Sequence, residues 1–326
     1  MSNAADGLAI RRRPLGRTGL MVGELGFGAW AIGGGFQVNG QGMGYGTTDD
    51  QVSLAALARA FELGVNFVDT ADTYGAGHSE TLIGRALKLA PRRVHVATKA
   101  GNVLRDSEPP RKDFSAKHLR QACDRSLSRL GVTCIDLYQL HNPPREVLAD
   151  PQVWDTLREL KDRGKIAHYG VSISAPEEGL LALEKGEVEA IQVCYHLLNS
   201  LAAQELFPLA EKKGVGIIVR EPLANGILSG KYRPGHLFSE TDHRRQTFSA
   251  EKLAAALQRV EALRFLSLDT QRTLAQAALQ FTLAHEAVSV VIPGIRTPQQ
   301  AEENVAAASS TVPGLSAEEL ARIQAA

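Results

Sequence analysis

Two kinds of hydrophobic pattern alternate along the chain. Short apolar runs rich in Val and Ile are typical of buried parallel strands, and longer segments with apolar residues every three to four positions are typical of packed helices. The short runs predict strands at 24–28, 65–69, 94–98, 134–139, 166–172, 190–193, 216–220 and 288–292. The longer segments predict helices at 51–63, 79–89, 115–130, 152–163, 176–185, 201–213, 273–286 and 299–306.

Residues that start and stop helices support these boundaries. Ser115 and the pair Asp150-Pro151 are typical of helix starts. Glycines follow four predicted helices just before the next strand: Gly64, Gly131, Gly164 and Gly214.

Strict alternation of strand and helix favours a parallel (β/α)8 TIM barrel, with residues 1–326 in a single barrel domain. An open doubly wound sheet is the alternative. Such a sheet usually carries a GxGxxG turn after its first strand, and Gly33-Gly34-Gly35 does not supply that turn in the right frame.

Segments outside the repeat predict a plug and several lids. Residues 8–21, with a turn at 17–20, predict an N-terminal β-hairpin that closes the bottom of the barrel. The connections 33–50, 101–114 and 221–268 are long, and the last is expected to contain a helix at about 250–264. Ordered loops of this length often act as lids over a site.

Composition excludes several classes of partner. Lys+Arg and Asp+Glu both number 36, so the net charge near zero favours neither nucleic acid nor an anionic membrane. No apolar run approaches the length of a membrane span, and residues 1–13 lack a signal-peptide core. Three cysteines without a CxxC pair indicate reduced thiols in a cytoplasmic protein, with no metal site. Oligomeric state is not indicated.

Four reactive side chains stand at or just beyond the ends of predicted strands. Asp69 ends the second strand and Tyr74 lies five residues further on, while Lys99 follows the third strand and His141 the fourth. The C-terminal ends of barrel strands converge on one face. These four side chains are therefore expected to meet.

The phrases around these residues, DTADTYG, ATKAG and LYQLHNP, resemble those of the aldo-keto reductases, and the resemblance extends over essentially the whole chain. It is closest to bacterial general carbonyl reductases and the potassium-channel β-subunit branch. The resemblance implies hydride transfer between a nicotinamide cofactor and an aldehyde or ketone, or a sugar or polyol in the oxidising direction. It also implies catalytic roles for Tyr74, Asp69, Lys99 and His141.

Elementary chemistry agrees with those roles. A tyrosine with a pKa of about 10 is a weak acid at neutral pH, and the ammonium group of Lys99 favours its phenolate. Asp69 would pair with Lys99 and make a buried cation tolerable. His141 would donate a hydrogen bond to the substrate oxygen and assist proton transfer from Tyr74.

The resemblance also implies a site for the nicotinamide ring. Ser172 and Gln192 would hold its carboxamide, and Ile173 stands where Asn is common, so Asn199 is a candidate to compensate. Arg220 stands where an aromatic residue often stacks on the ring. A guanidinium plane can stack there too, although Arg220 could instead only pair with its neighbour Glu221.

The rest of the cofactor is expected to follow the seventh and eighth strands. The pyrophosphate would meet Pro222, Leu223, Asn225, Gly226, Ser229, Gly230 and Lys231, and the adenosine Gly294, Arg296, Gln300, Glu303 and Asn304. A helix N-terminus beside Arg296 suits a 2′-phosphate. Gly294-Ile295 and Gln300 replace basic or hydroxyl residues common in the family, so phosphate binding rests mainly on Arg296. We expect NADPH to be preferred over NADH.

The substrate is expected to be a small carbonyl compound bound by Trp30, Tyr74 and His141. Further aromatic or imidazole candidates are Phe36, Tyr45, Tyr195, His196 and Phe238.

Two other functions compete with the reductase. One is a cofactor-sensing regulatory subunit of the channel β-subunit type with incidental turnover. The other is an isomerase or aldolase with Lys99 as a Schiff base, which would not need Tyr74 and His141 in these places.

Overall fold

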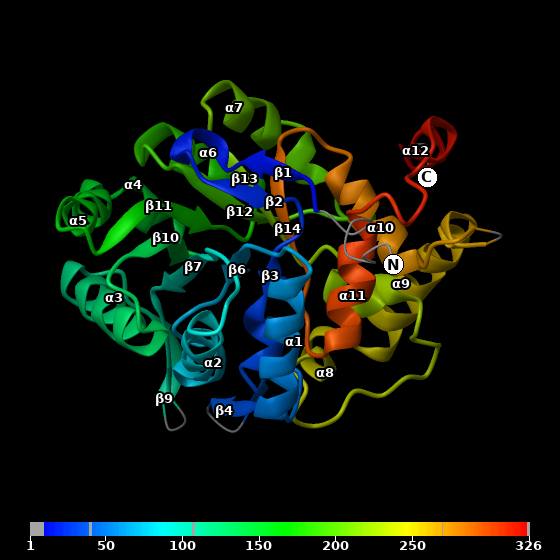
Figure 1. The fold of residues 1–326 in the computed structure, drawn as a ribbon, viewed down its shortest axis with the longest axis horizontal. Coiled ribbons are helices and arrows are strands. Elements are labelled where there is room, and N and C mark those ends of the chain that lie inside the picture. Colours follow the sequence, from blue (N-terminus) through cyan, green and yellow to red (C-terminus); the bar gives the residue numbers. More distant parts are fainter. Residues whose placement is uncertain (1–9, 39–40, 106–107, 269, 325–326) are drawn as a thin grey trace.

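The computed structural model describes residues 10–38, 41–105, 108–268 and 270–324. Eight parallel strands form one sheet in the order β14-β13-β12-β11-β10-β7-β6-β3 (Figure 1). Their bounds are β3 (Phe27–Gly28), β6 (Phe67–Asp69), β7 (His95–Ala100), β10 (Ile135–His141), β11 (Ile166–Ser172), β12 (Ala190–Cys194), β13 (Gly216–Arg220) and β14 (Val288–Ile292). Parallel bridges from Leu25 to Val291 and from Gly28 to Gly294 join the first strand to the last. The predicted barrel is confirmed, and every predicted strand has a counterpart.

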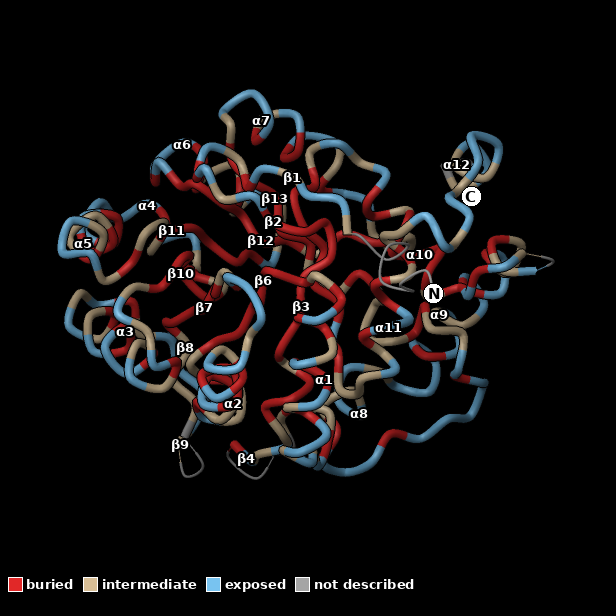
Figure 2. The backbone as a smooth tube through the Cα atoms, in the orientation of Figure 1, coloured by how far each residue is buried: buried red, intermediate tan, exposed pale blue. Residues whose placement is uncertain are grey.

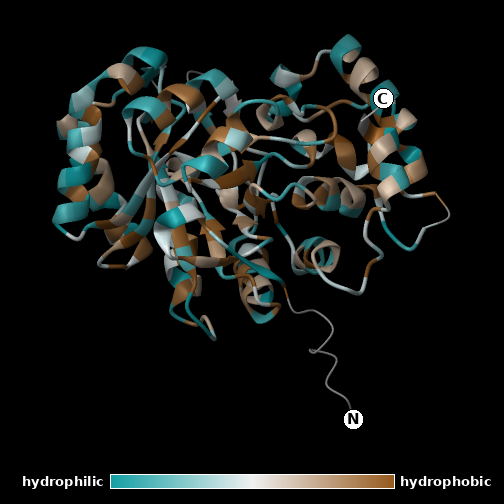
Figure 3. Ribbon diagram, turned by 90° about the horizontal axis from the view of Figure 1, so that it is seen from above, coloured by the Kyte–Doolittle hydropathy of each residue, from teal (hydrophilic) through white to brown (hydrophobic). Residues whose placement is uncertain are grey.

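Helices form an outer layer around the barrel. They are α1 (Asp50–Glu62), α2 (His78–Leu87), α3 (Ala116–Leu130), α5 (Pro151–Asp162), α6 (Pro176–Lys185), α7 (Leu206–Lys212), α10 (Leu274–Leu283) and α11 (Pro298–Ala307). Figure 2 shows buried strands enclosed by helices whose outer sides are exposed, and Figure 3 shows polar residues on those outer sides. Among the residues that the structure describes, no helix has the length and apolar character needed to cross a bilayer.

The helix boundaries follow from the predicted caps. The Ser115 hydroxyl accepts a hydrogen bond from the His118 backbone N–H, and the Asp150 carboxylate accepts one from Gln152. Gly131 and Gly164 end α3 and α5 with left-handed φ values of 66° and 68°. Only a residue without a Cβ adopts this conformation readily, so both helices stop where the sequence predicted.

One predicted helix is wrong. Residues 201–213 form a short 3-10 turn, η4 (Leu201–Ala203), and a separate helix, α7. Pro208 lies in the first turn of α7, where a missing backbone N–H breaks no hydrogen bond. A helix beginning at Leu201 would place Pro208 in its interior, so the chain starts a new helix instead.

The N-terminal hairpin pairs β1 (Arg12–Pro14) with β2 (Met21–Gly23). Leu15 and Val22 are fully buried against barrel residues such as Phe67 and Leu137. The hairpin therefore closes the N-terminal end of the barrel as predicted. Residues 8–9, the predicted start of the hairpin, lie outside the described residues.

The long connections carry structure that the sequence did not predict. The connections 33–50 and 101–114 contain antiparallel hairpins, β4 (Phe36–Val38) with β5 (Gln41–Met43) and β8 (Asn102–Arg105) with β9 (Glu108–Lys112). The connection 221–268 holds η5 (Ala224–Ser229), α8 (Arg244–Thr247), α9 (Ala250–Ala262) and η6 (Arg264–Leu266), of which only α9 was predicted. The short helices α4 (Arg145–Ala149) and α12 (Ala317–Gln324) were also not predicted.

Candidate active site

The four reactive side chains lie together at the C-terminal end of the barrel. Asp69 ends β6, Lys99 is on β7, His141 ends β10, and Tyr74 begins the 3-10 turn η3 (Tyr74–Gly77). A cavity of about 230 Å³ opens there. Its walls are formed by Gly28, Ala29, Trp30, Asp69, Tyr74, His141, Asn142, Ser172, Gln192, Arg220, Glu221, Asn225, His243, Ile292 and Gly294.

The ammonium group of Lys99 joins Asp69 to Tyr74. Its Nζ donates to Asp69 Oδ1 at 2.5 Å, to the Thr70 carbonyl at 2.7 Å and to Tyr74 Oη at 3.1 Å. All three ammonium protons are therefore directed to partners. Burial is the largest single influence on the pKa of Lys99 and lowers it, but the charges of Asp69 and Tyr74 and the hydrogen bonds to both together outweigh burial, and the pKa is raised. Lys99 stays charged although it is fully buried.

The second oxygen of Asp69 is held by two amides. Asp69 Oδ2 accepts from Gln192 Nε2 at 2.7 Å and from Gln139 Nε2 at 3.1 Å. Gln139 was not predicted as a site residue. The signal was available, because Gln139 and His141 are two apart on one strand and so face the same side. Three donors on one carboxylate fix the orientation of Asp69.

Tyr74 is a neutral phenol in this environment. Burial raises the pKa of Tyr74, and the positive charge of Lys99 works in the opposite direction without cancelling it. The sequence alone suggested only that Lys99 lowers the pKa of Tyr74, because the burial of the hydroxyl group is decided by the tertiary structure. The Tyr74 ring packs edge-on against Trp30, with centroids 4.7 Å apart, and against His141 at 5.8 Å.

His141 is neutral as well. Burial lowers the pKa of His141 well below its ordinary value, and the nearby charges of Lys99, Arg220 and Lys112 lower it further. His141 Nδ1 is buried and has no hydrogen-bond partner among the described residues. The cavity thus contains a phenol that can give up a proton and an imidazole that can bind an oxygen atom.

Amide and hydroxyl groups line the next part of the cavity. Ser172 Oγ donates to Asn142 Oδ1 at 3.3 Å and lies 3.4 Å from Gln192 Oε1. The sequence interpretation missed Asn142, which follows His141 directly. Asn199, the proposed substitute, pairs with His196 in a turn and does not line the cavity. Ile173 is fully buried in the core. Such a donor and acceptor set fits the carboxamide of a nicotinamide ring.

Arg220 lies at the edge of this group. Its guanidinium pairs with Glu221, and its Nη2 donates to the Ile173 carbonyl at 3.1 Å. The Nε atom of Arg220 is buried without a partner in the part of the chain that the structure describes. Arg220 therefore pairs with Glu221 and also forms part of the cavity wall, which leaves both sequence hypotheses for it open.

The predicted pyrophosphate segment forms the compact turn η5. Ala224, Asn225 and Gly226 have left-handed φ values of 48°, 56° and 89°. Ser229 Oγ donates to the Gly226 carbonyl at 2.6 Å, and Lys231 Nζ lies 5.0 Å from the centre of the Tyr232 ring. Pro222, Leu223 and Gly230 flank the turn. Of this set, Asn225 lines the cavity, and its Nδ2 donates to Glu221 Oε2 at 3.1 Å.

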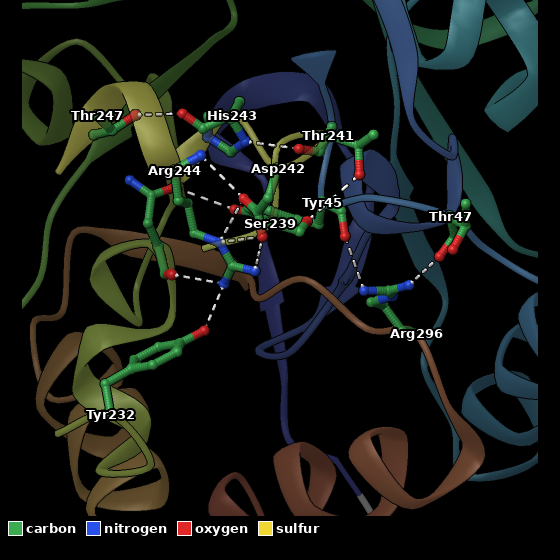
Figure 4. Close-up of polar contacts among 12 residues, drawn as sticks. Tyr45, Thr47, Tyr232, Ser239, Thr241, Asp242, His243, Arg244, Thr247 and Arg296 are labelled. Atoms are coloured by element: carbon green, nitrogen blue, oxygen red, sulfur yellow. Dashed lines mark hydrogen bonds and ion pairs between the residues drawn. The ribbon is translucent and has the colours of Figure 1, made fainter. Parts of the chain in front are cut away.

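The predicted adenosine residues gather at the start of α11. The Thr297 hydroxyl caps this helix by accepting from the Gln300 backbone N–H, and Gln300 Oε1 accepts from the Arg296 N–H at 2.8 Å. The Arg296 guanidinium donates to the carbonyls of Tyr45 at 3.2 Å and Thr47 at 2.6 Å (Figure 4). On the next turn Glu303 is exposed and Asn304 is buried, while Gly294 lines the cavity.

The predicted aromatic contacts divide into two groups. Trp30 lines the cavity, and Tyr45 packs edge-on behind it with centroids 6.5 Å apart. The other candidates lie elsewhere. Tyr195 packs against Phe207 and Phe281, and Phe238 packs against Tyr232 and Phe248. His196 Nδ1 accepts a hydrogen bond from the Leu198 backbone N–H. Phe36 belongs to β4. Glu221 and His243 line the cavity, although neither was predicted as a substrate contact.

Comparison with known proteins agrees with this geometry. A family model described as the aldo/keto reductase family matches residues 24–326. The chain belongs to the aldo/keto reductase family. Among curated relatives, this aldo/keto reductase is 31% identical over 311 residues to the NADH-specific methylglyoxal reductase of Escherichia coli (strain K12), covering 91% of this chain and 93% of that protein.

Two solved structures are also similar. The holo form of the aldo-keto reductase AKR11C1 from Bacillus halodurans has a TM-score of 0.78 and 32% identity, covering 97% of this chain and 96% of that one. The glycerol dehydrogenase AKR11B4 from Gluconobacter oxydans has a TM-score of 0.79 and 28% identity, covering 99% of this chain and 95% of that one. Family and fold are therefore established together, and they make the chain an oxidoreductase of the nicotinamide-dependent kind.

Proposed function

We propose that this aldo/keto reductase is an NADPH-dependent enzyme that reduces small aldehydes or ketones, with Tyr74 as the general acid. The observation that carries the proposal is the bonded series Asp69–Lys99–Tyr74, which ends at a hydroxyl in the cavity wall. In the reverse reaction the same groups would oxidise an alcohol group of a sugar or polyol.

The bound nicotinamide would supply the hydride, and the chain supplies the proton and the orientation. As negative charge develops on the substrate oxygen, Tyr74 donates its proton to that oxygen. Lys99, 3.1 Å from the phenol oxygen, stabilises the phenolate that remains. His141 binds the same substrate oxygen as a neutral donor, and Asp69 keeps Lys99 charged and in place. Asn142, Ser172 and Gln192 would orient the carboxamide, with Arg220 beside the ring.

The test is the replacement Tyr74→Phe, with NADPH oxidation followed at 340 nm in the presence of an activated aromatic aldehyde. We expect kcat to fall by a factor of about 100 to 10,000, the range typical of a lost general acid, with cofactor binding retained. Tyr195→Phe is the matched control, because Tyr195 is a buried tyrosine outside the cavity. Full activity in Tyr74→Phe would refute the assignment. Binding of NADPH without turnover by the wild type would support a cofactor-sensing subunit instead.

The preference for NADPH rests on Arg296. One relative is named as NADH-specific, so the preference needs its own test. Replacement of Arg296 by Ala should weaken NADPH binding roughly 10- to 100-fold, the value of hydrogen bonds to a charged group, and NADH binding far less. Arg59→Ala is the control, because Arg59 pairs with Glu302 further along α11 and is not among the residues expected to bind the cofactor. Equal weakening of both cofactors would contradict the role of Arg296.

We further infer that residues 1–326 act as one domain in the cytoplasm. Cys123, Cys134 and Cys194 are free thiols. Burial raises the pKa of Cys123 to about 12 and that of Cys194 to about 11, so these two thiols are neutral and unreactive. Free thiols of this kind suit a reducing compartment.

A further inference from the structure

His243 lies in the cavity wall although it is far from the barrel strands in sequence. It belongs to the connection 221–268 and precedes α8 directly. Its ring packs edge-on against Trp30, with centroids 5.8 Å apart, and lies 5.0 Å from the Tyr45 ring. Trp30 in turn contacts Tyr74, so His243 is placed one aromatic ring away from the proposed acid.

One nitrogen of the His243 ring is already used. His243 Nδ1 lies 3.0 Å from the carbonyl oxygen of Gly44, and the backbone N–H of His243 donates to the same oxygen. A carbonyl only accepts, so in a neutral imidazole the proton is on Nδ1. The other nitrogen, Nε2, is then an acceptor, and no described residue bonds to it.

A second acceptor stands in the same wall. The Glu221 carboxylate pairs with Arg220 and accepts from Asn225, which holds it in place and offsets its charge. Carboxylate oxygens have lone pairs beyond those two contacts. The wall beyond Tyr74 and His141 therefore offers acceptors to any group that carries hydroxyl hydrogens.

We propose that His243 is a specificity-determining residue that accepts a hydrogen bond from a hydroxyl group of the substrate, so that the preferred substrates are short hydroxylated aldehydes or ketones. This inference rests on the proposed reductase function. A site built to bind a hydroxyl group discriminates against an analogue without it, because the acceptor in the cavity wall is then left without that hydrogen bond.

The test compares glyceraldehyde with propanal, which has the same number of carbon atoms and lacks both hydroxyl groups. The measured quantity is the ratio of the two kcat/KM values with NADPH. Wild type should prefer glyceraldehyde. His243→Phe, which keeps the ring contacts and removes the acceptor, should lower the ratio about fivefold to tenfold, mainly through the KM of glyceraldehyde. Hydration of the aldehydes in water is the same for every variant and cancels.

Two further variants make the result specific. His243→Gln keeps an acceptor and a donor for Gly44 and should restore part of the ratio. His236→Phe is the matched control, because exposed His236 lies in the same connection, packs on Tyr232 and Phe238, and does not line the cavity. It should leave the ratio unchanged.

Each failure has a separate signature. An unchanged ratio in His243→Phe would overturn the role of His243 and leave the reductase function standing. Higher turnover of an aldehyde that carries a carboxylate, such as glyoxylate, would indicate that Arg220 rather than His243 determines the preferred substrate. Failure of the wild type to reduce any of these aldehydes would count against the proposed function itself.

Discussion

Two aspartates three residues apart show how environment decides the chemistry of a side chain. Asp69 accepts hydrogen bonds from Lys99, Gln139 and Gln192. Asp72 has only the backbone N–H of Thr73 as a donor among the described residues, and its Oδ1 is buried without a partner there. Burial, followed by the charge of Glu80, raises the pKa of Asp72 to about 7. The first aspartate is held by three donors, and the second is a carboxyl group that stays protonated in weak acid.

The raised pKa of Asp72 predicts a loss of stability as pH rises. In the unfolded chain its pKa is near 3.8, so between about pH 4 and pH 7 the folded protein holds a proton that the unfolded chain has released. The free energy of unfolding therefore falls across this window. Asp72→Asn removes the effect and should stabilise the protein at pH 8 by up to roughly 4 kcal/mol, with little difference near pH 4.

Urea unfolding at pH 4 and at pH 8 measures this difference. Asp162→Asn, at the exposed C-terminal end of α5, is the control and should change stability similarly little at both pH values. A stabilisation by Asp72→Asn that is equal at both pH values would contradict the explanation.

At the scale of elements, the hairpin of β1 and β2 depends on close contact with β13. The backbone N–H of Arg17 donates to the Gly214 carbonyl at 2.7 Å. A Cβ atom on Gly216 would lie 2.7 Å from Leu15 Cδ1, and one on Gly16 would lie 2.3 Å from the backbone nitrogen of Gly216. Two facing glycines let the hairpin approach the barrel closely enough for Leu15 to fill its lower end.

Replacement of Leu15 by Ala should open a cavity at the bottom of the barrel. Leu15 is completely buried, and such replacements typically cost about 2–5 kcal/mol. Denaturant unfolding of Leu15→Ala and of Met21→Ala gives the comparison. Met21 lies on the same hairpin and is 46% exposed, so its replacement should cost less than about 1 kcal/mol. If the two variants lose the same stability, the hairpin is not a packed plug.

At the scale of the whole molecule, two connections far apart in sequence meet over the cavity. Residues 43–48 and 239–247 are joined by a bridge between Tyr45 and Asp242 and by the contacts of Arg244, and we call this pair of segments the clasp. Arg244 pairs with Asp242, donates to Tyr232 Oη at 2.7 Å and lies 4.4 Å from the Tyr45 ring centre (Figure 4). Arg296 bonds to the same loop from α11. The clasp therefore connects the predicted adenosine site with the wall that holds His243.

Loss of Arg244 should open the clasp without unfolding the barrel. Arg244→Met leaves Asp242 buried and unpaired, and breaking a pair of this kind costs about 3–5 kcal/mol. We expect faster hydrogen exchange in 43–48 and 239–247, unchanged exchange in the barrel strands, and a higher KM for substrate. The neighbouring Arg245 is exposed, so Arg245→Met is the control and should leave exchange unchanged. Exchange that rises throughout the chain would show a general loss of stability instead.

The sequence by itself determined the barrel and the meeting of Asp69, Tyr74, Lys99 and His141. Apolar periodicity and helix caps act over a few residues, and the alternation of strand and helix then forces strand ends to one face. Pro208 is a local signal for the helix break before it, and the predicted helix 201–213 did not take it into account. Binding roles for the cofactor residues stay predictions that the experiments above test.

Only the tertiary structure decided the second layer of the site. Gln139 lies within reach of Asp69 across the intervening strand β7, and Asn142 lies within reach of Ser172 on the adjacent strand β11. Glu221 and His243 line the cavity because the connection 221–268 folds back over the barrel and bonds to residues 43–48. Outside α9 that connection has no regular period, and its course depends on contacts between residues about 200 positions apart, such as His243 with Gly44. Contacts at such separation exist only once the whole chain has folded.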